Sequence, residues 1–111
     1  MTQEQQIKAL AELDGWTSLG QDAEMIEHWI QFPRDVVSRL SYDEIRKQRR
    51  WSLPPYLTSY DAIIPLIQKQ DGHTLQRIWW HINQLNHVYK FMVSPAQLCE
   101  ALLRATGKWT E

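Results

Sequence analysis

Residues 94–107, SPAQLCEALLRATG, carry the clearest helix signal in the chain. Ser94 is a helix-capping residue, Pro95 suits the first helical position, and Gln97 completes a capping box with Ser94. Gly107 suits the left-handed position that follows a helix. Apolar side chains recur between these signals at helical spacing, at Leu98, Ala101, Leu102 and Ala105. The segment therefore predicts a helix that begins after Ser94, ends before Gly107 and buries one face.

Two earlier segments carry similar signals. Thr2 and Gln5 form a capping-box pair, and Gly15 stops the helix that they begin. The apolar stripe of this helix is Ile7, Leu10 and Leu13. Ser41 with Glu44 offers another capping box and predicts a short helix over residues 42–49, preceded by a short helix or an irregular connection over 34–40.

Three further elements are expected. A helix is predicted after Ser59, with Pro65 distorting or delaying its start. An apolar period near 3.6 predicts a helix over 74–86, after a break at Asp71-Gly72. Its stripe is Leu75, Ile78, Trp79, Ile82 and Leu85. If Trp79 faces the core, Trp80 lies about 100° away and is exposed, so we expect an interface role for Trp80.

The remaining apolar segments are shorter. The spacing of apolar residues indicates a helix face over residues 22–32, ended by Phe32-Pro33. That face consists of Met25, Ile26, Trp29 and Ile30. Residues 88–93 mix β-branched and aromatic side chains and are the best strand candidate. Together the elements predict a helix-dominated α+β fold.

Size and charge limit the classes of protein. The chain has 111 residues, of which 43% are hydrophobic and 23% charged, and its net charge is −1. We expect one globular domain over residues 1–111, with no membrane span and no readable secretory signal. Cys99 is the only cysteine, which excludes an intramolecular disulfide and fits a reducing, cytoplasmic setting. The charge excludes a generally basic nucleic-acid binder but not a local basic patch. Some of the six Trp are expected at an interface or in a ligand pocket.

The stretch LPPYLTSYDAI, residues 53–63, and the helix with its tail over residues 94–109 resemble segments of a known family. The first is similar to the P-x-Y-x-x-S-x-D-A-I segment of the phage ABA sandwich domain family, and the second resembles that family's C-terminal helix with a Gly-Lys-Trp-like tail. Gly15-Trp16 also fits, whereas residues 20–50 match no pattern. The resemblance implies an α-β-α sandwich with a small sheet between helices, and a bacteriophage or prophage source. It implies no established reaction and no catalytic residues.

A basic–aromatic segment, residues 46–51, is the main candidate site. Four cations and one indole stand together there: Arg46, Lys47, Arg49, Arg50 and Trp51. Guanidinium groups bind phosphates bidentately, and an indole stacks on a base, so the segment suits a nucleotide or a nucleic-acid backbone. The same cations also suit a solvated helix end, where they complement the helix dipole, or an acidic protein partner.

Other reactive side chains form no recognisable site. The four histidines, His28, His73, His81 and His87, include no pair at helical metal-ligand spacing, so we expect no metal. A titratable group of Asp22, Glu24, Glu27 and His28 would need a cleft for acid–base chemistry. Cys99 fits a buried apolar position better than a nucleophile.

The expected function is therefore binding rather than catalysis. We expect a cytoplasmic phage or prophage accessory protein, without a cofactor and forming a homo-oligomer. It would counter host defence by sequestering an anionic, nucleotide-type ligand or by masking a host protein, an expectation that rests on analogy. The alternative is a nucleic-acid-binding accessory protein that uses residues 46–51.

Overall fold

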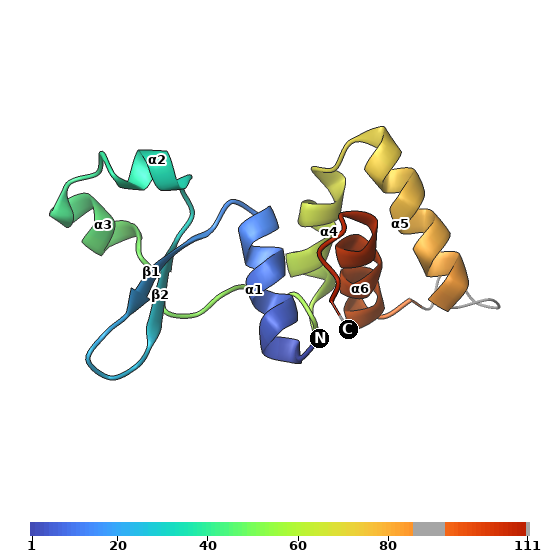
Figure 1. The fold of residues 1–111 in the computed structure, drawn as a ribbon, viewed down its shortest axis with the longest axis horizontal. Coiled ribbons are helices and arrows are strands. Elements are labelled where there is room, and N and C mark those ends of the chain that lie inside the picture. Colours follow the sequence, from blue (N-terminus) through green and yellow to red (C-terminus); the bar gives the residue numbers. More distant parts are fainter. Residues whose placement is uncertain (86–92, 111) are drawn as a thin grey trace. The chain divides into compact units, whose positions relative to one another are not determined.

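The computed structural model describes residues 1–85 and 93–110, which hold helices and one small sheet (Figure 1). In chain order these elements are α1 (Gln3–Leu13), β1 (Thr17–Gln21), β2 (Glu27–Ile30), α2 (Arg34–Val37), α3 (Tyr42–Gln48), α4 (Tyr60–Gln68), α5 (Gly72–Leu85) and α6 (Pro95–Ala105). The predicted helix-dominated α+β class is confirmed. No helix within these residues is both long and apolar enough to span a membrane.

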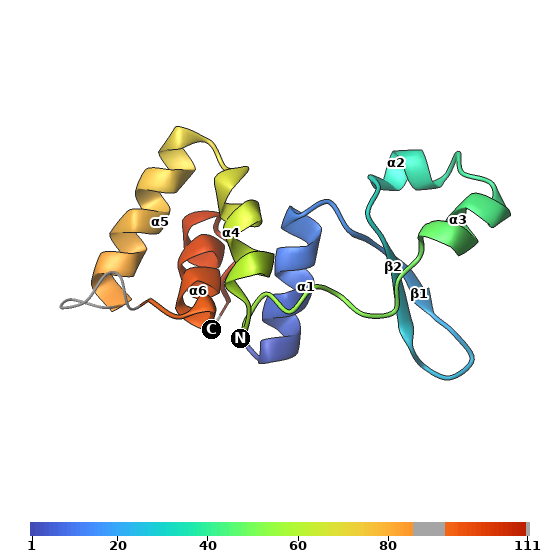
Figure 2. The ribbon, with the colours of Figure 1, turned by 180° about the vertical axis from the view of Figure 1, so that it is seen from behind.

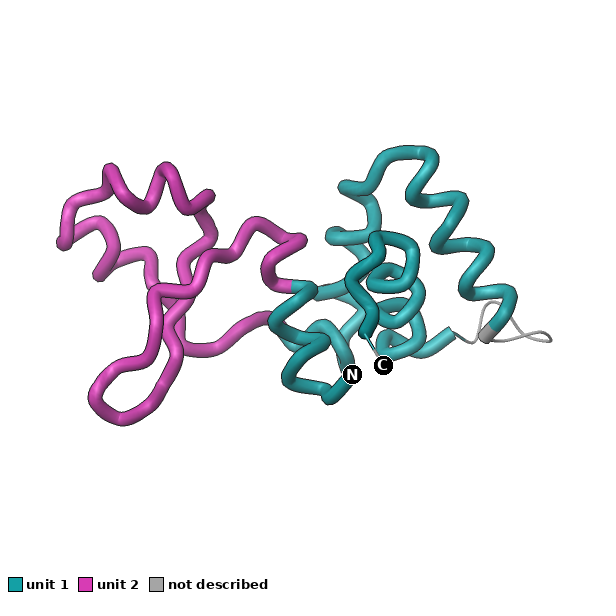
Figure 3. The backbone as a smooth tube through the Cα atoms, in the orientation of Figure 1, with its two compact units in different colours: residues 1–10, 55–111 teal, residues 11–54 magenta. Residues whose placement is uncertain are grey.

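The chain forms two compact units (Figure 3). Unit 1 contains residues 1–10 and 55–111, and unit 2 contains residues 11–54. The single domain over residues 1–111 therefore stays a prediction, and each unit is described by itself.

The predicted ends of α1 and α6 are confirmed. The Thr2 hydroxyl accepts from the Gln5 amide at 3.1 Å, while the Gln5 side chain accepts from the Thr2 amide at 2.9 Å. Ser94 and Gln97 repeat this box at 3.2 and 3.0 Å. Each helix is followed by a glycine with positive φ, which is 86° at Gly15 after α1 and 74° at Gly107 after α6. The amide that follows each glycine, in Trp16 and in Lys108, donates back to the third-last helical carbonyl, which satisfies that carbonyl in a Schellman arrangement.

The core of unit 1 forms around α6, which packs against α5 and α4 (Figures 1 and 2). Its largest fully buried side chains include Tyr56, Ile63, Leu66, Leu102 and Leu103. The predicted α6 stripe is confirmed at Ala101, Leu102 and Ala105, whereas Leu98 is only half-buried. The N-terminal ammonium group donates to the Thr110 carbonyl at 3.1 Å, which ties the two ends of the chain together.

Helix α5 differs from its prediction in its start and its buried face. It begins at Gly72 because Asp71 Oδ1 accepts from the Thr74 amide at 2.7 Å, so Asp71 caps this helix. Ile78 and Ile82 are buried, but Trp79 is 53% exposed, and the prediction that Trp79 faces the core is wrong. The contact with α6 fixes a narrow i, i+4 stripe and leaves the neighbouring indole outside it. The predicted exposure of Trp80 is confirmed at 57%.

Helix α4 starts earlier than a proline at position 65 suggested. The Ser59 carbonyl accepts from the Ala62 and Ile63 amides, so the first turn is complete before Pro65. Pro65 lies inside the helix and removes one donor from its backbone ladder. Burial of Ile63 and Leu66 on this helix offsets that loss.

Unit 2 contains a β-hairpin in the segment for which the sequence predicts a helix face. Residues 22–32 are not a helix, because β1 and β2 pair antiparallel, with Thr17 opposite Ile30 and Gln21 opposite Glu27. The hairpin loop extends away from α2 (Figure 2). Helix α2 realises the short helix over 34–40, and the Ser41 hydroxyl caps α3 by accepting from the Glu44 amide at 3.3 Å. The predicted strand at 88–93 falls on residues that, apart from Val93, lie outside those described.

Candidate functional site

The loop of the hairpin, residues 22–26, is organised by Asp22. The Asp22 amide donates to the Ile26 carbonyl at 3.0 Å, and the Met25 amide donates to the Asp22 carbonyl at the same distance. Asp22 Oδ1 accepts from the amides of Glu24 and Ile26, at 2.8 and 3.1 Å. This Asx-type turn holds Met25 at a φ of +65°. The backbone that carries Glu24 and Ile26 is thereby fixed.

A backbone bridge brings the segment after α3 alongside β2. The Trp29 and Arg50 amides each donate to the other's carbonyl at 2.7 Å, an isolated antiparallel pair. Side chains alternate across an extended backbone, so Arg49 and Trp51 lie on the face opposite to Arg50. In this register Trp51 is the cross-strand neighbour of His28. Their rings meet edge to face with centroids 6.3 Å apart.

His28 joins the loop to this aromatic contact. Its Nε2 lies 2.8 Å from Asp22 Oδ2, and its side chain is only 12% exposed. This hydrogen bond is the largest cause that holds the pKa of Asp22 below its usual value, and the Ile26 amide adds to it. His28 Nδ1 is buried and has no hydrogen-bond partner within residues 1–85 and 93–110. The imidazole therefore has one nitrogen engaged and one unsatisfied.

These side chains line one cleft of about 380 Å³, here called the hairpin cleft. Its lining combines two carboxylates, an imidazole, a guanidinium, an indole and an aliphatic side chain: Asp22, Glu24, His28, Arg49, Trp51 and Ile26. A second cleft of about 300 Å³ shares Asp22, His28 and Arg49 with it and continues along Leu19 and Gly20. Arg49 is thus common to two adjoining spaces.

The basic–aromatic segment is divided by the fold. Arg46 and Lys47 lie in the last turn of α3, where they line a separate depression with Asp43. The Arg50 guanidinium donates to the Lys47 and Arg49 carbonyls at 3.4 and 3.1 Å and so completes the end of α3. Of the predicted ligand-binding residues, Arg49 and Trp51 line the hairpin cleft together. Unit 2 also carries six Lys and Arg against eight Asp and Glu, so it is not a basic unit.

The sequence alone does not show that the hairpin residues of the cleft come together with Arg49 and Trp51. Asp22, Glu24 and His28 were grouped as titratable residues, but the cleft that gives them a role needs a hairpin rather than a helix. Glu27 does not line it, since its Oε1 accepts from the Ser18 hydroxyl at 2.6 Å. Ile26 was expected on a buried helix face and instead lines the cleft. The available signal was Gly20 and Asp22, two turn-forming residues within three positions.

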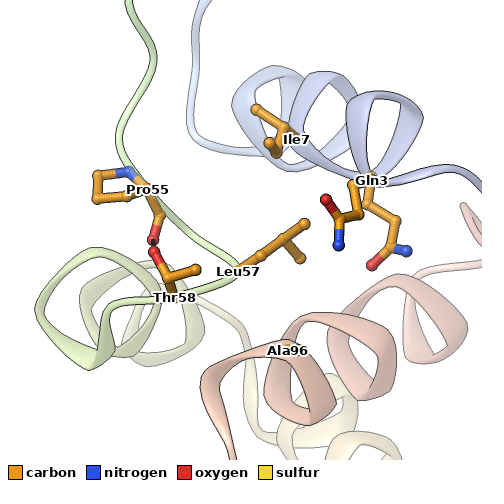
Figure 4. A pocket seen from close by; sticks show the side chains of 7 residues that line it. Gln3, Ile7, Pro55, Leu57, Thr58 and Ala96 are labelled. Atoms are coloured by element: carbon orange, nitrogen blue, oxygen red, sulfur yellow. Dashed lines mark hydrogen bonds between the residues drawn. The ribbon is translucent and has the colours of Figure 1, made fainter.

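Other candidate positions offer less chemistry. Trp80, on α5, meets the His81 ring edge to face at 4.9 Å. A cavity of about 300 Å³ in unit 1 is lined by amide, hydroxyl and apolar side chains from α1, the 55–58 turn and α6 (Figure 4). Leu57 extends there toward Gln3, and no titratable side chain lines this cavity. No group of three His, Cys, Asp or Glu suited to a metal ion occurs among the residues described.

Comparisons of the chain with family models, curated proteins and solved structures find no match. The resemblance to the phage ABA sandwich domain family, and the layered sandwich that it implies, stay predictions.

Proposed function

We propose that unit 2 is a non-enzymatic binding module that holds a nucleotide-type ligand in the hairpin cleft. The observation that carries this proposal is the meeting of Arg49 and Trp51 in one cleft with His28. A nucleotide needs a flat apolar surface for its base and a cation for its phosphate. The cleft supplies both within a volume that suits a small ligand.

Trp51 supplies the stacking surface. Trp51 is 67% exposed although its indole is one of the largest apolar groups in unit 2. The His28 ring contacts it edge to face, and the Arg50–Trp29 bridge fixes its backbone, so the indole is held before a ligand arrives. Stacking on such a held indole contributes about 1 to 3 kcal/mol per base.

Arg49 supplies the phosphate-binding group. Within the part of the chain that the structure describes, no carboxylate pairs with its guanidinium, and a guanidinium binds phosphate bidentately. Asp22 does not compete for it, because both of its oxygens are engaged by the loop amides and His28. The cleft therefore retains a cation for an anionic ligand.

The proposal is tested by isothermal titration calorimetry of the full chain with GMP and AMP. Arg49→Ala and Trp51→Ala are each expected to weaken binding about tenfold or more. Arg46→Ala and Trp80→Ala are the matched controls, since each removes an exposed residue of the same type outside the cleft, and both should bind as the unmodified chain does. Absence of binding by either nucleotide, or equal losses in controls and cleft variants, would contradict the proposal.

The nucleic-acid alternative needs a contiguous basic surface. Arg49 lines the hairpin cleft whereas Arg46 and Lys47 line another depression, and Arg50 is used at the end of α3, which favours a small ligand instead. Steep weakening of DNA binding with rising salt would support that alternative. The further proposals are a phage or prophage source, a role against host defence by sequestration or by masking a host protein, a cytoplasmic location and a homo-oligomer. They rest on composition and on the resemblance.

A further inference from the structure

We infer that the hairpin cleft selects guanine among the nucleobases, an inference that rests on the proposed function. Its basis is Glu24, the second carboxylate of the cleft. The carboxylate oxygens of Asp22 are already hydrogen-bonded, Oδ1 to the Glu24 and Ile26 amides and Oδ2 to His28. Within residues 1–85 and 93–110, no donor engages the Glu24 carboxylate, and the Glu24 residue is exposed. The cleft thus presents one acceptor group that the protein itself does not satisfy.

A carboxylate discriminates between bases by the donors at their edges. Guanine presents two adjacent donors, N1–H and the N2 amino group, which match the two oxygens of a carboxylate. Adenine and cytosine place an amino group beside a ring-nitrogen acceptor, whose lone pair repels a carboxylate. Uracil has a single N–H between two carbonyl oxygens. Glu24 therefore favours guanine, in the way that a polar site rejects ligands that leave its groups unpaired.

The charges of the cleft set the orientation of the ligand. Arg49 attracts the phosphate and Glu24 repels it, so the phosphate lies toward Arg49 and the base edge toward Glu24. Trp51 lines the same cleft and covers the face of the base. The adjoining space along Leu19 and Gly20, which Arg49 also lines, leaves room for the sugar–phosphate part.

Calorimetry with GMP, IMP and AMP on the full chain tests this inference. IMP keeps N1–H but lacks the N2 amino group, so the expected order is GMP, IMP, AMP, with GMP about tenfold tighter than AMP. In Glu24→Gln this preference should disappear, so that GMP and AMP bind with about equal affinity and AMP binding is not lost. The loop is held by the Glu24 amide rather than its side chain, so this variant keeps the fold. Glu44→Gln, an exposed carboxylate of α3 outside the cleft, should keep the full preference.

The outcomes separate the two proposals. Equal affinity for GMP and AMP in the unmodified chain would overturn guanine selection and leave nucleotide binding intact. A guanine preference that survives in Glu24→Gln would also overturn it. If none of the three nucleotides binds, the proposed function fails, and the inference fails with it.

Discussion

At the scale of single residues, Met25 shows how the hairpin loop accepts local strain. It has a φ of +65°, a conformation that costs an L-residue with a side chain about 1 to 2 kcal/mol, and the residue is 72% exposed. The Asp22 hydrogen bonds on either side of Met25 impose this conformation. No burial of the methionine side chain offsets its cost.

We therefore predict that Met25→Gly stabilises the protein. The gain in the free energy of unfolding should be about 0.5 to 1 kcal/mol, because glycine adopts positive φ freely but has more entropy in the unfolded chain. Urea denaturation followed by circular dichroism measures it. Met25→Ala removes the same exposed side chain while keeping the strain, and it should give no gain. Equal stabilisation by both substitutions would contradict this explanation.

Local residue patterns predicted the helix caps well. Thr2, Ser41 and Ser94 cap the helices for which they were named, because a cap closes its hydrogen bonds within three residues. Asp71 was interpreted as the end of one segment although it caps the next, since capping and turn-forming roles use the same side chain. The prediction that Trp79 is buried was wrong for another reason, because the packing of α6 decides which side of α5 is buried.

At the scale of elements, the hairpin was missed because its apolar pattern does not alternate. Trp29 and Ile30 are adjacent and both buried, whereas Met25 and Ile26 are both exposed, so four apolar residues at helical spacing suggested a helix face. Strand β1 contributes only one large apolar side chain, Leu19. The pairing is decided by the Asp22 turn and by the bridge to Arg50, more than twenty residues from Asp22.

The hairpin should lose stability in acid through Asp22. The pKa of Asp22 is held below its usual value, chiefly by the hydrogen bond to His28, so its ionised form stabilises the folded state. This contribution is complete above the unfolded-state pKa and is lost as the pH falls through the lower folded-state pKa. Asp22→Asn keeps an oxygen acceptor without the charge. The unmodified chain should be the more stable at neutral pH, and in urea denaturation the two should converge as the pH falls through the folded-state pKa of Asp22. A difference that stays constant across this range would contradict the assignment.

At the scale of the whole molecule, unit 1 supplies a core that can be probed through Cys99. Burial raises the pKa of the Cys99 thiol to about 12, and its Sγ donates to the Tyr56 carbonyl at 3.1 Å. The thiolate is the reactive form, so the native thiol is both inaccessible and protonated at mild alkaline pH. We predict that a disulfide reagent labels Cys99 in the native chain about a hundredfold or more slowly than in urea. Labelling at the rate of a free thiol would mean that this core is open.

The candidate site was predictable only in part, and the division follows the fold. Arg49 and Trp51 were identified because cations and an indole in one short segment are visible without a structure. Their separation from Arg46, Lys47 and Arg50 follows from the end of α3 and the alternation of an extended backbone. Glu24 and His28 join them through a bridge between distant residues, which no local pattern encodes.

The central claim is that a nucleotide stacks on Trp51, and the indole N–H signals of the six Trp test it directly. Two-dimensional NMR of the full chain would be recorded during addition of GMP, with Trp51→Phe and Trp80→Phe identifying the signals of these two exposed indoles. We predict that the Trp51 signal shifts progressively and saturates, while the Trp80 signal stays in place. An unmoved Trp51 signal, or equal movement of both signals, would contradict binding in the hairpin cleft.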